Sequence, residues 1–116
     1  MVFSFDYTQD QGIGHYLLKG NLIGESYGMT LLNSFAEQME LGMLNFAVDL
    51  SQLEHINSSG LGVLITMLTK ARKKDGELVL VSPSQNVRNL LLITKLNSIF
   101  QTFDGLDAAI EKIKTT

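Results

Sequence analysis

Two adjacent hydroxyl side chains and two glycines stand where a helix is predicted to begin, in the stretch Ile56-Asn57-Ser58-Ser59-Gly60-Leu61-Gly62. An Asn or Ser at this place can cap the helix, because its side chain accepts a hydrogen bond from a free backbone N–H group. Such a cap is worth about 1 kcal/mol, and it needs only one residue. Asn57, Ser58 and Ser59 together exceed that need, which indicates a further role for the loop.

Enzymatic roles for this loop find little support in the neighbouring residues. A nucleophile elbow needs Gly-x-Ser-x-Gly, but Ile56 and Asn57 stand where a glycine should precede each serine. His55 is close in sequence, yet a general base must be positioned in space and oriented by a third group. The Gly-Lys-Ser/Thr of a phosphate-binding loop and the third glycine of a dinucleotide site are both missing. We therefore predict no catalytic residue and no enzyme, with a small hydrolase using Ser58 or Ser59 and His55 as a weaker alternative.

Phosphorylation of one of the two serines would turn the loop into a switch. A phosphate group adds about −1.5 to −2 charges, and the partial positive charge of a helix N-terminus tolerates an anion. The fold would survive, whereas any partner docked on the loop would meet a new charge. Like charges brought together in an interface cost several kcal/mol, which corresponds to a large factor in affinity.

The helix that follows the loop carries two apolar stripes. One face holds Leu61, Leu64, Ile65 and Leu68. Val63 and Met67 lie off that face at helical spacing. A second apolar stripe indicates either burial on both faces or a surface for a partner, and methionine suits adaptable binding surfaces. The sequence leaves both interpretations open.

The composition fits one packed domain and limits its partners. The chain has 116 residues, of which 45% are hydrophobic, enough for one core and too few for two domains. Nine basic and twelve acidic residues give a net charge of −3, which argues against a nucleic-acid-binding surface. The one basic cluster stands at a predicted helix end, where positive charge interacts favourably with the helix dipole. Its members are Lys70, Arg72, Lys73 and Lys74.

Other classes of site are excluded or disfavoured by residues that are scarce. The sequence has no Cys, which rules out disulfides, thiolate catalysis and Cys-based zinc sites. His15 and His55 lie far apart in sequence, so we predict no metal site and no cofactor. No apolar run approaches the roughly 20 residues of a membrane span, and the first residues lack the pattern of a signal peptide. A cytoplasmic protein without membrane contact is expected.

Hydropathy patterns predict the elements that must position the loop. Alternation over residues 2–9 and 15–20 indicates a hairpin, and residues 22–28 could hold a short third strand. Helical spacing is seen at 26–41, ended by Gly42, and then from the loop to about 74, at 84–94 and at 104–116. Apolar runs at 43–50, 77–82 and 98–103 are read as strands. This alternation predicts a single α/β domain over 1–116, with a mixed sheet and about four helices packed mainly on one face.

The residues around the loop resemble the STAS domain family, and within it the stand-alone anti-sigma factor antagonists of bacteria. The matching positions are Asp49, Leu50, Ser51, Ser58, Ser59, Gly60, Leu61 and Gly62. The later pattern of strand, helix, a Phe100 segment and a final helix also matches, so that the resemblance covers nearly the whole chain. The N-terminal hairpin is its least distinctive part.

The resemblance implies a role in partner switching, which regulates transcription through a sigma factor. The serine before the first glycine, Ser59, would be the phosphorylation site, with Ser58 as second choice. An anti-sigma factor with serine kinase activity would bind the unphosphorylated chain, release the sigma factor and phosphorylate Ser59, and a PP2C-type phosphatase would reverse the modification. The partner-binding residues would be Asn57, Ser58, Gly60, Leu61, Val63 and Met67. Asp49 would hold the loop at the strand end, and the chain would be a monomer or weak homodimer.

Two positions depart from the family pattern. Asn57 replaces the usual Asp, which keeps a helix cap but removes a negative charge beside the loop. Lys95 stands where many relatives have glycine, which puts the expected helix end there in question. The main alternative function is a STAS domain that serves as a permanent, non-switching subunit of a signalling or lipid-transport complex.

Overall fold

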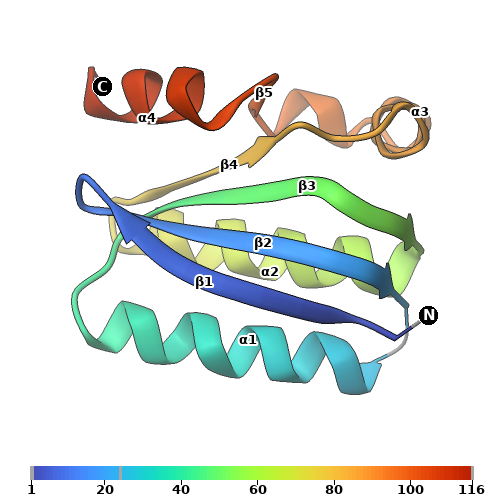
Figure 1. The fold of residues 1–116 in the computed structure, drawn as a ribbon, viewed down its shortest axis with the longest axis horizontal. Coiled ribbons are helices and arrows are strands. Elements are labelled where there is room, and N and C mark those ends of the chain that lie inside the picture. The colour runs from blue at the N-terminus through green and yellow to red at the C-terminus, as the bar shows by residue number, and fades with distance from the viewer. Residues whose placement is uncertain (1, 24, 116) are drawn as a thin grey trace.

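The computed structural model describes residues 2–23 and 25–115, which form one mixed sheet and the helices that cover it (Figure 1). The strands are β1 (Ser4–Asp10), β2 (Ile13–Leu22), β3 (Asn45–Ile56), β4 (Glu77–Val81) and β5 (Thr102–Phe103). The α-helices are α1 (Glu25–Glu40), α2 (Ser58–Lys73), α3 (Gln85–Ile93) and α4 (Leu106–Lys114), and a 3-10 turn, η1, spans Leu96–Ser98. No helix in these two described ranges has the length and apolar character needed to cross a bilayer.

The strands follow one another across the sheet in the order β1-β2-β3-β4-β5. The first pair is antiparallel and the other three are parallel, as the predicted hairpin and crossovers require. Gln11 and Gly12 connect β1 to β2 with φ angles of 54° and 81°. Two successive positive φ angles are typical of the tight hairpin turn whose twist matches that of the strands.

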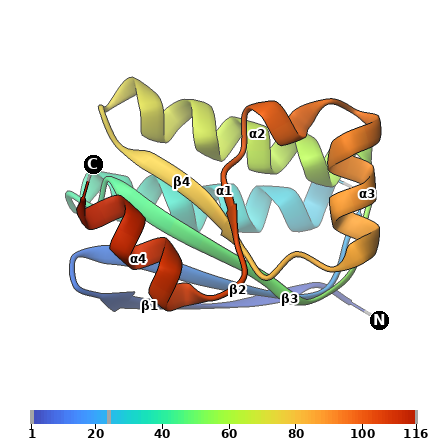
Figure 2. The same cartoon turned by 90° about the horizontal axis from the view of Figure 1, so that it is seen from above.

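The two faces of the sheet are covered unequally (Figure 2). Alternating residues of β3 point to opposite faces, so Phe46 and Val48 join the larger core with residues of α1, α2 and α3, whereas Ala47 joins the smaller core under α4. The larger core also holds Tyr16, whose buried hydroxyl lies 2.8 Å from Ser34 Oγ and whose pKa is raised to about 12 by burial. The predicted class, an α/β domain with helices mainly on one face, is confirmed, and α4 is the helix on the other face.

Strand β3 is longer than its apolar run. The prediction ended it at residue 50, but it continues to Ile56 through the polar segment Ser51-Gln52-Leu53-Glu54-His55. These residues pair in parallel with the end of β2, up to the partners Leu22 and Ile56. Backbone pairing to a long neighbour therefore extends the strand where side-chain patterning gives no signal. The predicted strand at 98–103 is shorter than expected, because η1 occupies its start and β5 spans Thr102–Phe103.

Two other expected boundaries can be compared with the structure. Gly42, predicted as the stop of the first helix, has φ of 101°, a left-handed conformation that favours glycine. The short strand considered within residues 22–28 is not found at its described positions, since β2 runs to Leu22 and α1 begins at Glu25. Residue 24 lies outside the described residues.

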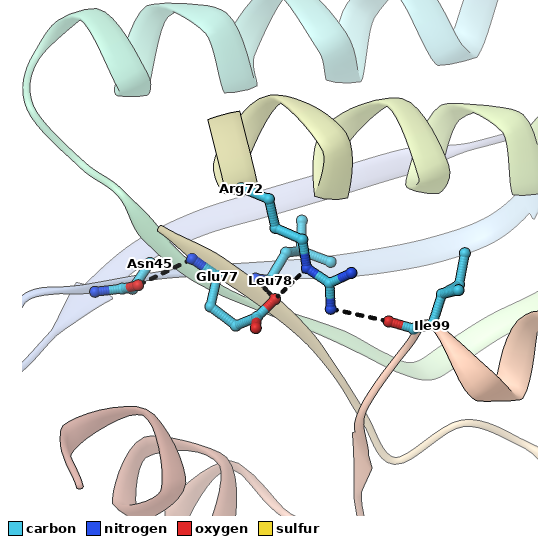
Figure 3. A network of polar contacts seen from close by, with 5 residues as sticks. All are labelled: Asn45, Arg72, Glu77, Leu78 and Ile99. Carbon is cyan, nitrogen blue, oxygen red and sulfur yellow. Dashed lines mark hydrogen bonds and ion pairs between the residues drawn. The ribbon is translucent and has the colours of Figure 1, made fainter. Parts of the chain in front are cut away.

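Arg72 fixes the C-terminal end of α2 to the sheet (Figure 3). Its Nε donates to Glu77 Oε1 at 3.2 Å and its Nη2 donates to the carbonyl of Ile99 at 3.1 Å. The backbone N–H of Glu77 donates in turn to Asn45 Oδ1 at 3.0 Å, which joins the starts of β3 and β4. The basic cluster at this helix end thus includes a residue that binds specific neighbours in addition to facing the helix dipole.

Lys95 occupies the position where glycine was expected, and it adopts the conformation that glycine would favour. Its φ and ψ are 62° and 18°, directly after α3 ends at Ile93 and the 3-10 turn begins. The helix therefore ends here with a lysine held in the left-handed region.

Replacing Lys95 with Gly is expected to raise the free energy of unfolding by about 0.5–1 kcal/mol, because the relief of left-handed strain exceeds the added entropy of the unfolded chain. Urea unfolding measures the change. Lys95→Ala is the matched control, since it removes the same side chain but keeps Cβ and hence the strain. Equal stability of the two variants would contradict this account.

Candidate functional site

The serine loop lies where β3 ends and α2 begins, at the edge of the sheet where β2 also ends. Asn57 is the helix cap: its φ and ψ are −116° and −172°, and its Oδ1 accepts the backbone N–H of Gly60 at 3.0 Å. The expected Asn57 cap is therefore made by an amide oxygen, with no carboxylate at this position. Only Asn57 of the three loop residues caps the helix, and one capping residue is enough.

Ser58 and Ser59 are both exposed in the first turn of α2. Within the part of the chain that the structure describes, neither hydroxyl makes a side-chain hydrogen bond. The first turn also contains no acidic residue. Each hydroxyl can therefore take a modifying group without breaking an internal bond, and the helix N-terminus would interact favourably with added negative charge.

Gly60 is buried, and the space around it leaves no room for a side chain. A Cβ at this position would lie 2.2 Å from the carbonyl oxygen of Leu22 and 2.7 Å from Ile56 Cγ1. The absence of a side chain allows the start of α2 to pack directly on the end of β2. Gly62, two residues later, differs, because a Cβ there would meet nothing within 4 Å.

The second apolar stripe of α2 belongs mainly to the core. Met67 of this stripe has no exposed surface and packs inside the larger core. Leu61, of the first stripe and also a predicted partner contact, is 3% exposed and lies in the same core. This corrects the prediction that Met67 extends a contact with a partner: α2 packs on β3 and β4 with α1 beside it on the same face of the sheet, and Met67 is covered. Val63 is 8% exposed and reaches the surface beside Ser59.

A shallow apolar groove of about 180 Å³ runs beside Ser59. Val63 and Ser59 of α2 line one side, and Gly28, Met29 and Leu32 of α1 line the other. The α1 residues were missed from the sequence, because helical spacing there identifies the buried face through Leu31 and Phe35 but does not reveal which neighbour the rest of the helix meets. Met29, 55% exposed, is an apolar residue that the helix leaves on its surface.

Asp49 does not lie at a strand end, which corrects its expected role in holding the loop. It is the fifth residue of the twelve in β3, and Asn57 lies eight positions further on, about 26 Å at the rise of an extended strand. Its Oδ1 accepts the backbone N–H of Ser51 at 2.8 Å, and its Oδ2 lies 3.8 Å from His15 Nε2. Asp49 therefore acts locally within the sheet.

The residues needed for a hydrolase are not assembled at the loop. His55 is exposed on β3, and no hydrogen bond joins it to Ser58 or Ser59 in the described ranges. Across the same ranges, no three His, Asp or Glu side chains lie close enough to hold a metal ion. The site offers an exposed hydroxyl, a favourable helix end and an apolar groove, which are the parts of a modifiable docking surface.

The mixed sheet and the loop at the start of α2 define a small α/β domain, and the comparisons with known proteins point to one family of such domains. The STAS domain matches residues 4–109. The chain belongs to the STAS domain family.

Relatives and solved structures extend this assignment. BtrV of Bordetella bronchiseptica, provisionally described as an anti-sigma factor antagonist, is 34% identical over 80 residues, 69% of each chain. A crystal structure of a Thermotoga maritima protein with the same provisional description has a TM-score of 0.84 and 26% identity, covering 95% of this chain and 94% of that one. The anti-sigma factor antagonist SpoIIAA from Bacillus, 16% identical, shares the fold in its unphosphorylated form, with a TM-score of 0.77 over 97% of this chain and 100% of that one. The phosphorylated form of SpoIIAA matches with a TM-score of 0.75, covering 95% of this chain and 99% of that one.

Proposed function

We propose that this chain is an anti-sigma factor antagonist whose binding is switched by phosphorylation of Ser59. The unmodified chain binds a kinase-type anti-sigma factor, so that the sigma factor is released. The modified chain dissociates, and a PP2C-type phosphatase restores it. The observation that carries the proposal is that Asn57 caps α2, while the exposed Ser59 hydroxyl makes no hydrogen bond within residues 2–23 and 25–115.

In the proposed modification, Ser59 accepts a phosphoryl group. Its Oγ forms a bond to the γ-phosphorus of ATP while the bond to the bridging oxygen breaks, giving phosphoserine, ADP and a proton. The phosphatase adds water across the ester and returns serine and inorganic phosphate. This chain supplies the accepting hydroxyl, and the partner supplies the catalytic groups.

Ser59 is preferred over Ser58 because of what surrounds it. Ser59 lines the groove formed with Met29, Leu32 and Val63, whereas Ser58 does not. A phosphate at Ser59 therefore lies beside apolar surface that a partner can cover. Asn57, Ser58 and the backbone around Gly60 complete the proposed contact, together with the exposed part of Val63.

Site-resolved mass spectrometry of the protein isolated from its own cells tests this proposal. We expect a population that is heavier by one phosphate, with the group on Ser59. Phosphate on Ser58 would retain the mechanism and correct the site. Unmodified protein under every growth condition would favour the permanent-subunit function, with the serine loop reduced to a helix cap and a contact.

A further inference from the structure

The groove beside Ser59 exists because α1 and α2 approach closely at Gly28. A Cβ on Gly28 would lie 2.5 Å from Val63 Cγ2, so the two helices can touch here only through a glycine. Met29 and Leu32 then stand beside this contact, with Met29 more than half exposed. The close contact between Gly28 and Val63, with the exposed Met29 beside it, forms a small apolar depression at the surface.

The lining of this groove indicates what it can hold. Among the described residues that line it, Gly28, Met29, Leu32 and Val63 are apolar and Ser59 is polar. A second groove, between the opposite ends of the same two helices, has a different character. It combines Ala36 and Met39 with four charged residues, which are Glu40, Lys70, Lys73 and Lys74. Of these two grooves, the one at Ser59 is suited to an uncharged, apolar group.

We propose that the groove receives one apolar side chain of the kinase-type anti-sigma factor as that protein docks on Ser59. This inference rests on the proposed function and adds the chemistry of the contact. The groove is continuous with the serine loop, because Ser59 and Val63 lie one helical turn apart on α2 and line the same depression. A partner that reaches Ser59 must therefore cover Met29 or leave apolar surface exposed.

This arrangement explains how one phosphate can release a whole partner. The group would bring about −1.5 to −2 charges to the rim of an apolar seat. The charge needs water, and a docked apolar side chain would exclude that water. Phosphorylation thus removes an apolar contact in addition to any repulsion between charges across the interface.

The test uses the full chain and each purified kinase-type anti-sigma factor of the same organism. Met29→Gln keeps the length and exposure of the side chain but makes its end polar, and we expect it to raise the Kd about tenfold. Leu41→Gln is the matched control, since Leu41 is 75% exposed just beyond the opposite end of α1. It is expected to change the Kd less than twofold.

Methyl-labelled methionine gives a second, direct readout by NMR. On addition of the anti-sigma factor, the Met29 methyl resonance should shift while that of Met39, in the second groove, stays in place. An unchanged Kd and resonance for Met29, with Ser59→Asp still disrupting the complex, would overturn the groove and leave the switch standing. If Met29→Gln and Ser59→Asp both bind the anti-sigma factor as tightly as the unmodified chain, the groove and the switch are both overturned. A Met29 shift that depends on the concentration of the chain alone would assign the groove to a second copy instead.

Discussion

Replacing Ser59 with Asp is expected to weaken the complex with the anti-sigma factor about 100-fold, since a charge buried at an interface costs several kcal/mol and every 1.4 kcal/mol is a factor of ten. Ser59→Ala should bind within about threefold of the unmodified chain, because it removes a hydroxyl that makes no hydrogen bond to the residues that the structure describes. Titration calorimetry with the purified partner measures both. Ser58→Asp is the matched control for charge in the same helical turn but outside the groove, and we expect it to weaken binding less.

The same variant separates a lost contact from a lost fold. The first turn of α2 contains no acidic residue, so an aspartate there interacts favourably with the helix dipole. The free energy of unfolding of Ser59→Asp should therefore stay constant or rise by about 0.3–1 kcal/mol. A variant that binds as tightly as the unmodified chain would refute the switch, and one that binds weakly but unfolds more easily would not support it.

Gly60→Ala is expected to destabilise the domain by about 3 kcal/mol, because overpacking against backbone cannot be relieved by turning a side chain. The added Cβ would meet the Leu22 carbonyl at 2.2 Å, and that residue is fixed by its pairing with Ile56 in the sheet. Either α2 shifts away from β2 or the end of the strand pair opens. Both changes remove buried contacts of Leu61.

Gly62→Ala is the matched substitution two residues later in the same helix. Its Cβ would have free space, so the higher helix propensity of alanine should raise the free energy of unfolding by up to about 1 kcal/mol. Urea unfolding of the two variants gives the comparison. Opposite signs are expected, and a similar effect from both glycines would show that helix propensity rather than packing governs this turn.

The sequence is sufficient for the order of elements and for the place of the loop. The hairpin, the crossovers and the four helices follow from apolar periodicity and from turn residues such as Gly42. The end of β3 does not follow, because residues 51–55 are held by pairing with β2 and four polar side chains around the single apolar Leu53 give no strand pattern. For the same reason, Asp49 could be mistaken for a residue at the strand end.

The candidate site could be predicted only in part, because its remaining features depend on how the helices pack. Periodicity indicates that Met67 faces something, but whether that is a partner or α1 depends on how the helices pack. Likewise, three residues in the loop could cap α2, and only the backbone geometry assigns the cap to Asn57. The groove at Met29 needs two helices distant in sequence, so no local pattern could have predicted it.

The cap made by Asn57 also bears on which part of the molecule would carry the proposed phosphorylation signal. Since the cap does not involve Ser59, and Arg72 anchors the other end of α2, modification of Ser59 as proposed would break no hydrogen bond among the described residues of the helix. Under the proposed switch, the chain needs no second conformation, so no conformational barrier sets how long the signal lasts. The signal would be held by the phosphoserine ester, and its lifetime would be set by the relative rates of the enzymes that form and cleave that ester.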